Sequence, residues 1–174
     1  NAYADSQTGA LFDGSGLKRQ RVDLVTNGVL NGLLYGRKSA SLSKTEPTGH
    51  GLPVPNNFGE YPMNFTVAGS DLELDDLIKS TDKGILLSRV WYVRTVDPAR
   101  KILTGMTRDG TYMIENGAIA YGVKNLRFNV SLLEFFNKVE LLGKPVRTAG
   151  EESLPGVVPP VKVHDFNFTE VTRF

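Results

Sequence analysis

The sequence predicts an α+β fold with a predominantly antiparallel β-sheet, sandwich or barrel-like, and two or three short helices. Short runs of β-branched and aromatic residues are separated by Asn-Gly and Asp-Gly pairs, which are typical of tight turns between antiparallel strands. Two Ser-x-x-Glu patterns predict helix starts. Because 174 residues are enough for one well-buried domain, residues 1–174 are expected to form a single domain.

The composition excludes several classes of function. The chain has no cysteine, so disulfides, thiol catalysis and thiolate metal sites are excluded. Its 20 basic and 19 acidic residues give no electrostatic reason to expect direct nucleic-acid binding or a membrane surface. No apolar run approaches the ~20 residues that span a bilayer, and we expect a cytoplasmic protein. The basic segment 18–21 is expected to be the solvated face of a strand entrance.

The first third of the chain is predicted to contain one hairpin and one long loop. Strands near 19–26 and 29–35 flank Asn27-Gly28, after an irregular entry that ends in turn residues 13–16. Residues 37–44 are expected to form one or two helical turns. The density of Pro and Gly over 45–62 predicts a loop, which could be functional or a plain surface excursion.

The middle of the chain begins with a strand over 63–68 and a helix over 71–80, which Ser70 and Glu73 are expected to cap. Residues 85–96 are dense in β-branched and aromatic side chains and predict a central strand covered on both faces. Arg89 and Arg94 interrupt those apolar faces. A strand end or a salt bridge would explain them, and so would a cleft lined by arginine.

Three further strands are expected near 101–107, 111–115 and 118–123. Tight turns at 108–110 and 116–117 would join them. A second capping pattern, Ser131 to Glu134, opens a helix that ends by Gly143, with an apolar stripe of Leu132, Phe136 and Val139 that Leu133 and Phe135 widen. A loop then leads to a last strand carrying Val161, Val163, Phe166 and Phe168.

Side chains that could carry chemistry are few. A catalytic zinc site needs about three protein ligands, and the two histidines, His50 and His164, are far apart in the sequence. No metal ligand and no catalytic residue is therefore assigned in this chain. Thr48 and His50 in the long loop, and Arg108 and Asp109, are the candidate substrate-binding residues. The alternative for the second pair is the polar tip of a hairpin.

The run from Thr104 to Gly143, TGMTRDGTYMIENGAIAYGVKNLRFNVSLLEFFNKVELLG, resembles the TldD/PmbA family. Residues 12–40 resemble the strand-turn-strand that follows that family's metal helix. Residues 47–51 (PTGHG) resemble its Thr-Gly-Asn-Gly loop. Members of this family have been described as modulators of DNA gyrase and as metallopeptidases.

The resemblance implies a β-rich C-terminal domain of a longer protein, preceded by an α/β domain. Active members carry an upstream His-Glu-x-x-x-His helix whose histidines bind zinc and whose glutamate is the general base, and a late cysteine completes the ligands. This chain has neither the motif nor a cysteine, and Ala149 stands where the cysteine would be. No cofactor is therefore expected in this chain. Zinc is expected in the full-length protein where the upstream motif exists.

Two kinds of function remain open, and with them the question whether the full-length protein is an active enzyme. The first is the C-terminal domain of a zinc metallopeptidase-related protein that acts on unfolded peptides, holding them extended at a strand edge. The second is a PmbA-like partner subunit without catalysis, or a regulatory binding protein of the gyrase-modulator kind. Both readings imply peptide binding and a homo- or hetero-dimer with a family member. Residues 102–136 would build the wall of the peptide-binding cleft.

Overall fold

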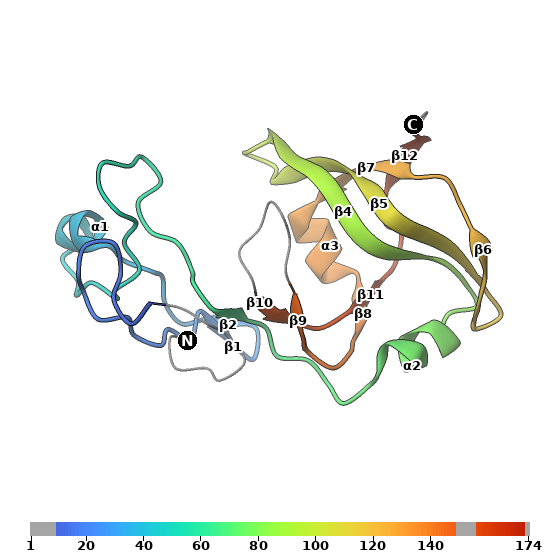
Figure 1. Ribbon diagram of the computed structural model, residues 1–174, viewed down its shortest axis with the longest axis horizontal. Helices are drawn as coiled ribbons and strands as arrows, with labels where there is room; N and C mark the ends of the chain where they lie inside the picture. The colour runs from blue at the N-terminus through green and yellow to red at the C-terminus, as the bar shows by residue number, and fades with distance from the viewer. Residues whose placement is uncertain (1–9, 149–155, 173–174) are drawn as a thin grey trace. The chain divides into compact units, whose positions relative to one another are not determined.

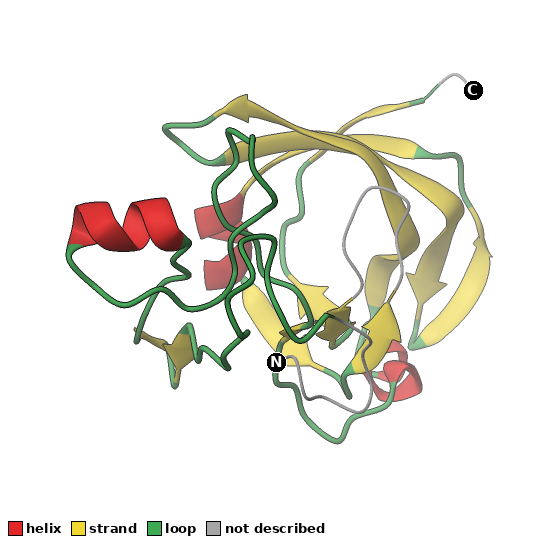
Figure 2. Ribbon diagram, turned by 60° about the vertical axis from the view of Figure 1, so that its left-hand side comes forward, coloured by secondary structure: helices red, strands yellow, loops and turns green. Residues whose placement is uncertain are grey.

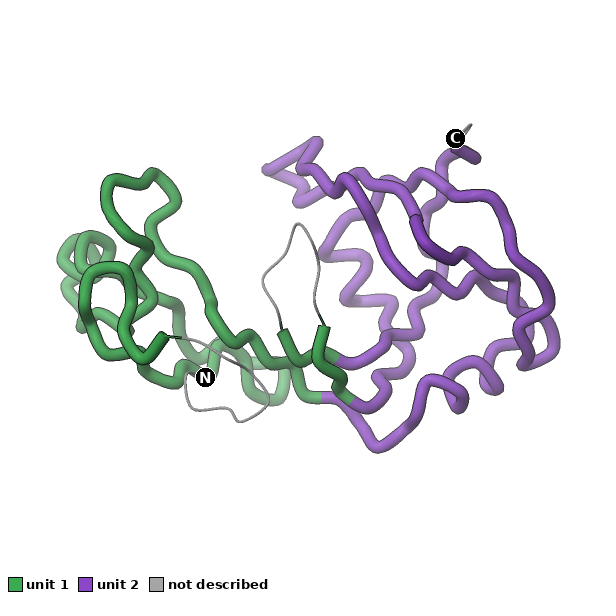
Figure 3. Tube along the Cα trace, in the orientation of Figure 1, with its two compact units in different colours: residues 1–68, 145–158 green, residues 69–144, 159–174 purple. Residues whose placement is uncertain are grey.

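The computed structural model describes residues 10–148 and 156–172, which divide into two compact units (Figure 3). The first unit takes its residues from 1–68 and 145–158, and the second from 69–144 and 159–174. The chain crosses between them more than once, so neither unit is continuous in sequence. The predicted architecture is confirmed, because most strand pairs are antiparallel and the described residues contain three short helices.

A five-stranded antiparallel sheet forms the second unit (Figure 1). Four strands follow one another in the order β12-β7-β5-β4, and β6 also pairs with β5. Figure 2 shows these strands curving together; within the described residues the path stays open and does not close into a barrel. The strands are β4 (Lys83–Asp97), β5 (Ile102–Glu115), β6 (Ala118–Gly122), β7 (Leu126–Ser131) and β12 (Phe168–Val171).

Strand β5 runs straight through the segment predicted to turn at 108–110. Leu87 pairs with Thr111 and Arg89 with Arg108, so Asp109 and Gly110 together face Ser88 in a β-bulge. Asp109 has φ 60° and Gly110 has φ 139°. The predicted turn at 108–110 is wrong. An Asp-Gly pair readily adopts positive φ, which both a tight turn and this bulge require, so the pair does not distinguish them. The turn at Asn116-Gly117 is confirmed, with φ 50° and 75°.

The predicted central strand is an edge strand. Over the described residues β4 pairs only with β5, whereas β5 has β4 on one side and β6 and β7 on the other. Apolar side chains on both faces of β4 do not require cover, since Val90, Tyr92 and Val96 are 44%, 51% and 56% exposed. The interior strands of this sheet are therefore β5 and β7, which each pair on both sides.

Two helices and a two-stranded sheet complete the second unit. Helix α2 (Leu74–Lys79) begins at Glu73 and not at Ser70, because the Asp76 carboxylate accepts from the Glu73 N–H at 2.9 Å. Ser70 instead donates to the Leu142 carbonyl. Helix α3 (Leu132–Asn137) has the predicted cap, with the Glu134 N–H donating to Ser131 Oγ at 3.5 Å. It is shorter than predicted, because the chain continues as β8 (Val139–Leu142), which pairs with β11 (Val161–Val163).

Phenylalanine rings form one apolar cluster of the second unit, in addition to the buried Leu77, Ile78 and Ile114. Phe128 is 3% exposed, and its ring centroid lies 5.2 Å from that of Phe166, which also contacts Phe135 and Phe168. Phe136, predicted to pack, is 69% exposed. Phe135, which widens the predicted stripe, is the α3 aromatic that reaches this cluster, so the stripe is confirmed at Phe135 and wrong at Phe136.

The first unit has little regular structure. The Asn27-Gly28 turn is confirmed, with φ 52° and 78°, but it joins strands of only two residues, β1 (Val25–Thr26) and β2 (Val29–Leu30). Helix α1 (Arg37–Ser43) is where it was predicted. The predicted strand 63–68 is reduced to β3 (Phe65–Thr66), which pairs in parallel with β10 (Gly156–Val158). β10 also pairs with β9 (Val146–Thr148), inside the predicted loop.

None of the helices within 10–148 and 156–172 is long and apolar enough to cross a membrane.

Candidate functional site

The loop that carries Thr48 and His50 is held by its own side chains. Thr48 Oγ1 accepts from the Tyr35 N–H at 2.9 Å, and His50 Nδ1 lies 2.9 Å from the same oxygen. Gly49 has φ 69°, and a Cβ there would lie 2.2 Å from the Lys18 carbonyl oxygen. The sequence Thr-Gly-His is therefore matched to one tight path of the backbone.

Asp13 anchors the same loop from the N-terminal side. Its Oδ1 accepts from the Ser15 N–H, the Ser15 hydroxyl and the Leu17 N–H at 2.8–2.9 Å, and its Oδ2 accepts from the Gly51 N–H at 2.9 Å. Burial raises the pKa of Asp13, but these four donors outweigh it and hold the pKa below its ordinary value. Asp13 is thus a buried carboxylate that joins residues 13–17 to the His50 loop.

Arg19 brings a positive charge to the interior beside His50. It is 9% exposed, and its Nη1 donates to the Gly49 carbonyl at 3.4 Å. Burial, and then the Arg19 charge, lower the pKa of His50, which is 5% exposed. The imidazole is therefore neutral at pH 7 and can act as a hydrogen-bond donor or acceptor, but not as a cation.

These contacts change the interpretation of the basic segment 18–21. Arg19 is buried and Gln20 donates from Nε2 to the Pro47 carbonyl at 3.2 Å, whereas Lys18 and Arg21 are exposed, Arg21 in an ion pair with Asp23. The segment is not the face of a strand entrance, since the first strand begins at Val25. Asp13 and Arg19 were missed as members of this cluster. The Asp-Gly-Ser-Gly sequence at 13–16 predicts a turn, but it does not indicate that Asp13 binds the loop at Gly51.

Arg108 and Asp109 belong to the other unit and to a different cluster. Asp109 Oδ2 forms an ion pair with Arg89 Nη2, and Asp109 Oδ1 lies 3.9 Å from Arg108 Nε. The two guanidinium carbons lie 5.2 and 5.4 Å from the centroid of Trp91. Of the explanations considered for Arg89 in the apolar strand, the structure shows the salt bridge, with Asp109. The substrate-binding role predicted for Thr48, His50, Arg108 and Asp109 stays a prediction.

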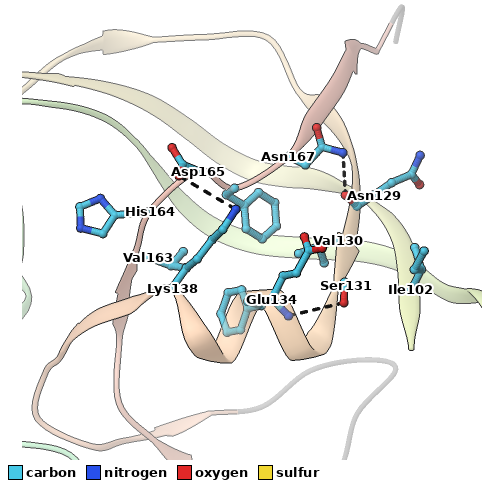
Figure 4. Close-up of a pocket in the computed structure, with 12 residues that line it drawn as sticks. Ile102, Asn129, Val130, Ser131, Glu134, Lys138, Val163, His164, Asp165 and Asn167 are labelled. Carbon is cyan, nitrogen blue, oxygen red and sulfur yellow. Dashed lines mark hydrogen bonds and ion pairs between the residues drawn. The ribbon is translucent and has the colours of Figure 1, made fainter. Parts of the chain in front are cut away.

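A cavity of about 400 Å³ lies between α3, the end of β7 and the β11–β12 connection (Figure 4). Lys138 reaches across it toward Asp165, with Nζ 4.0 Å from Oδ2. His164 lines the same cavity, and its Nε2 contacts Glu140 Oε2 at 2.8 Å. Phe135 and Phe166 supply apolar lining and Glu134 and Asp165 supply carboxylates, so the cavity combines charges of both signs with aromatic surface.

The described residues do not form a zinc site. No three of their His, Cys, Asp or Glu side chains gather in a way that could hold a metal ion, and His50 and His164 lie in different units. Ala149, which stands where the resemblance would place a third ligand, lies outside the described residues. This chain's described side chains thus do not fit the metal.

Comparison with known proteins gives one consistent family. The chain is 27% identical over 150 residues to the metalloprotease TldD homolog of Buchnera aphidicola, covering 82% of this chain and 30% of that protein. It is 22% identical over 151 residues to metalloprotease PmbA of Escherichia coli O157:H7, covering 86% and 31%. The chain thus spans about a third of the length of these relatives.

Among solved structures, TldE from Thermococcus kodakarensis superposes with a TM-score of 0.79 at 17% identity, over 98% of this chain and 38% of that one. At that identity the likeness establishes the fold alone. The family model described as the PmbA/TldA metallopeptidase C-terminal domain matches residues 4–170. The chain therefore belongs to the PmbA/TldD metallopeptidase family, the one its sequence resembles, and corresponds to that family's C-terminal domain.

Proposed function

We propose that the full-length protein is a zinc-dependent peptidase of unfolded peptides, and that this chain holds the peptide in extended form along the free edge of β4. Membership of a metallopeptidase family supports the reaction class. The metal ligands would come from parts of the longer protein, since the described residues gather none.

One observation carries the role of this chain. Strand β4 is 15 residues long and, in the described part of the chain, pairs along one side only. The outward N–H and C=O groups of such an edge can pair with an added peptide strand. Main-chain pairing does not depend on the peptide's sequence, and it requires an extended chain. Both properties suit a peptidase of unfolded substrates.

Side chains along the edge strand add apolar contact. Val90, Tyr92 and Val96 are each about half exposed, and they lie within a few residues of one another on β4. Side chains of an added strand would lie about 5 Å from these neighbours. A peptide paired here would therefore bury part of an apolar surface that the sheet leaves open.

Amide hydrogen exchange tests the role of β4 directly. In the free chain, alternate β4 amides that point away from β5 should exchange fast, and those that point toward β5 should be protected. Saturating unfolded peptide should protect the fast set and leave β6, which lies elsewhere in the sheet, unchanged. If peptide binds without protecting any β4 amide, the edge is not the binding site.

The reaction itself needs the full-length protein. We expect zinc at one equivalent per chain and cleavage of a reduced, unfolded substrate but not of its folded form. Peptide binding without zinc and without cleavage would instead assign the second candidate, a non-catalytic partner subunit, to which the cysteine-free sequence points. Gel filtration of the full-length protein, alone and with a family member, would test the proposed homo- or hetero-dimer.

A further inference from the structure

Positive charge is concentrated on one part of the β4–β5 ribbon. We call residues 88–109 the basic ribbon; they include the outer part of β4, the connection and the first half of β5. The whole chain carries a formal net charge of only +1. The basic ribbon has two acidic residues against five basic ones, namely Arg89, Arg94, Arg100, Lys101 and Arg108.

Three of these arginines are held in place by aromatic rings. The guanidinium carbons of Arg89 and Arg108, which are cross-strand partners, lie 5.2 and 5.4 Å from the Trp91 centroid. That of Arg94 lies 4.5 Å from the Tyr92 centroid. Stacking restricts these long side chains before any ligand arrives, so less conformational entropy is lost when they bind an anion.

The ribbon already holds one carboxylate. The β5 bulge places Asp109 so that one oxygen contacts Arg89 Nη2 and the other lies 3.9 Å from Arg108 Nε. A carboxylate can thus lie between two stacked guanidinium groups on this face. The guanidinium of Arg108 has five N–H donors and faces Asp109 through Nε at 3.9 Å, so it can also bind a carboxylate of a ligand.

The charge also limits what can pair with the free edge of β4. A second copy of the same edge would bring Arg89 and Arg94 against like charges, which disfavours pairing between copies of this chain. A peptide with acidic side chains would bring opposite charges to the same positions. Nucleic acid would satisfy the charge as well, but it offers no backbone to the N–H and C=O groups of a strand edge.

We propose that the basic ribbon selects extended peptides that carry acidic side chains. The inference rests on the proposed function, because it takes strand pairing at β4 as the mode of binding. Pairing would supply affinity for any extended chain, and Arg108 would supply the preference. The substrates would then be acidic segments of unfolded polypeptides.

Three fluorescent eight-residue peptides test this preference on the 174-residue chain. Each alternates threonine with a second residue, which is glutamate, glutamine or lysine. Fluorescence anisotropy should give about tenfold tighter binding for the glutamate peptide than for the glutamine peptide, the size of one or two charge-assisted contacts. The preference should disappear between 50 and 500 mM NaCl, since exposed charges are screened.

One variant and a matched control locate the preference. Arg108→Gln should reduce the glutamate-over-glutamine ratio by about threefold and leave the glutamine peptide's affinity unchanged. Arg21→Gln removes the same charge from an exposed ion pair in the other unit and should change neither. The salt dependence of the unmodified chain keeps the test valid if a variant does not fold.

The outcomes separate the two ideas. Equal affinity for the glutamate and glutamine peptides would overturn the acidic preference and leave strand pairing intact. Absence of binding by all three peptides would overturn both. Displacement of the glutamate peptide by single-stranded oligothymidine at a lower concentration than by unlabelled peptide would assign the ribbon to nucleic acid and also overturn the proposal.

Discussion

The Asp13 carboxylate accepts four hydrogen bonds in the first unit, and Asp13→Asn is the smallest change that tests its importance. An amide has nearly the same shape, but only one of its two terminal atoms accepts hydrogen bonds. With its oxygen at the position of Oδ1, asparagine keeps the donors of Ser15 and Leu17. Its NH₂ group then faces the Gly51 N–H, which donates to Oδ2 at 2.9 Å in the native chain.

The expected loss is about 3 kcal/mol. Leaving the buried Gly51 N–H without an acceptor costs ~1–3 kcal/mol. The remaining three bonds at 2.8–2.9 Å lose the charge assistance that makes such bonds about twice as strong as neutral ones. The matched control is Asp23→Asn. Asp23 is 58% exposed in its pair with Arg21, so the control should cost less than ~1 kcal/mol.

Hydrogen exchange is the appropriate assay, because the single tryptophan, Trp91, lies in the second unit and reports little on the first. The Tyr61 N–H donates to the His50 carbonyl at 3.0 Å, and the mutation does not touch that bond. Its exchange should become about 100-fold faster in Asp13→Asn, since 1.4 kcal/mol is tenfold. Exchange within threefold of the native rate would refute the view that Asp13 holds the His50 loop.

Two further predictions concern one residue in each unit. Stability of the first unit should fall as the pH drops below 6.5. Burial and Arg19 lower the pKa of His50 in the folded chain beneath that value, so the unfolded chain takes up the proton first. In His50→Gln the exchange rate of the Tyr61 amide, corrected for its intrinsic pH dependence, should therefore vary less between pH 7 and 5, and an unchanged slope would contradict this. Gly105→Ala places a Cβ 2.5 Å from the Phe128 ring and should cost about 2 kcal/mol in urea unfolding followed by Trp91 fluorescence. Gly122→Ala, in β6 with no atom within 4 Å of the added Cβ, should cost less than 1 kcal/mol, and equal losses would exclude the ring contact as the cause.

Local backbone chemistry explains which parts of the fold could be predicted. Asn27-Gly28 and Asn116-Gly117 form the expected turns, because two successive residues with positive φ favour a two-residue hairpin. Strand β4 was located for the same kind of reason, by its β-branched and aromatic residues. Its place at the edge could not be predicted, since that depends on which other strands reach it and not on its own sequence.

The candidate sites show the same limit more sharply. Asp13 and Gly51 are 38 positions apart and Arg19 and Gly49 are 30 apart, yet their contacts define the His50 loop. Nothing local in a charged residue states that its partner is a distant backbone group. The burial of Arg19 could not be predicted, because charged residues in a segment such as Lys-Arg-Gln-Arg are mostly exposed.

Asp109 lies both in the segment wrongly predicted to turn and in the arginine cluster of the basic ribbon. The Asp-Gly pair at 109–110 was expected to end a strand, and it instead inserts one extra residue into a continuous one. A regular strand would alternate side chains between faces and would keep neighbouring residues 108 and 109 apart. The bulge breaks that alternation, so Asp109 reaches both Arg89 and Arg108. An aspartate with φ 60° is unfavourable by roughly 1 kcal/mol, and the ion pair with Arg89 offsets it.

Replacing Asp109 by asparagine, which tolerates the same φ, would keep the bulge while removing the internal carboxylate. If the basic ribbon binds acidic peptides, Asp109→Asn should bind the glutamate peptide about threefold tighter than the native chain; weaker binding would mean that Asp109 positions the arginines and does not compete for them.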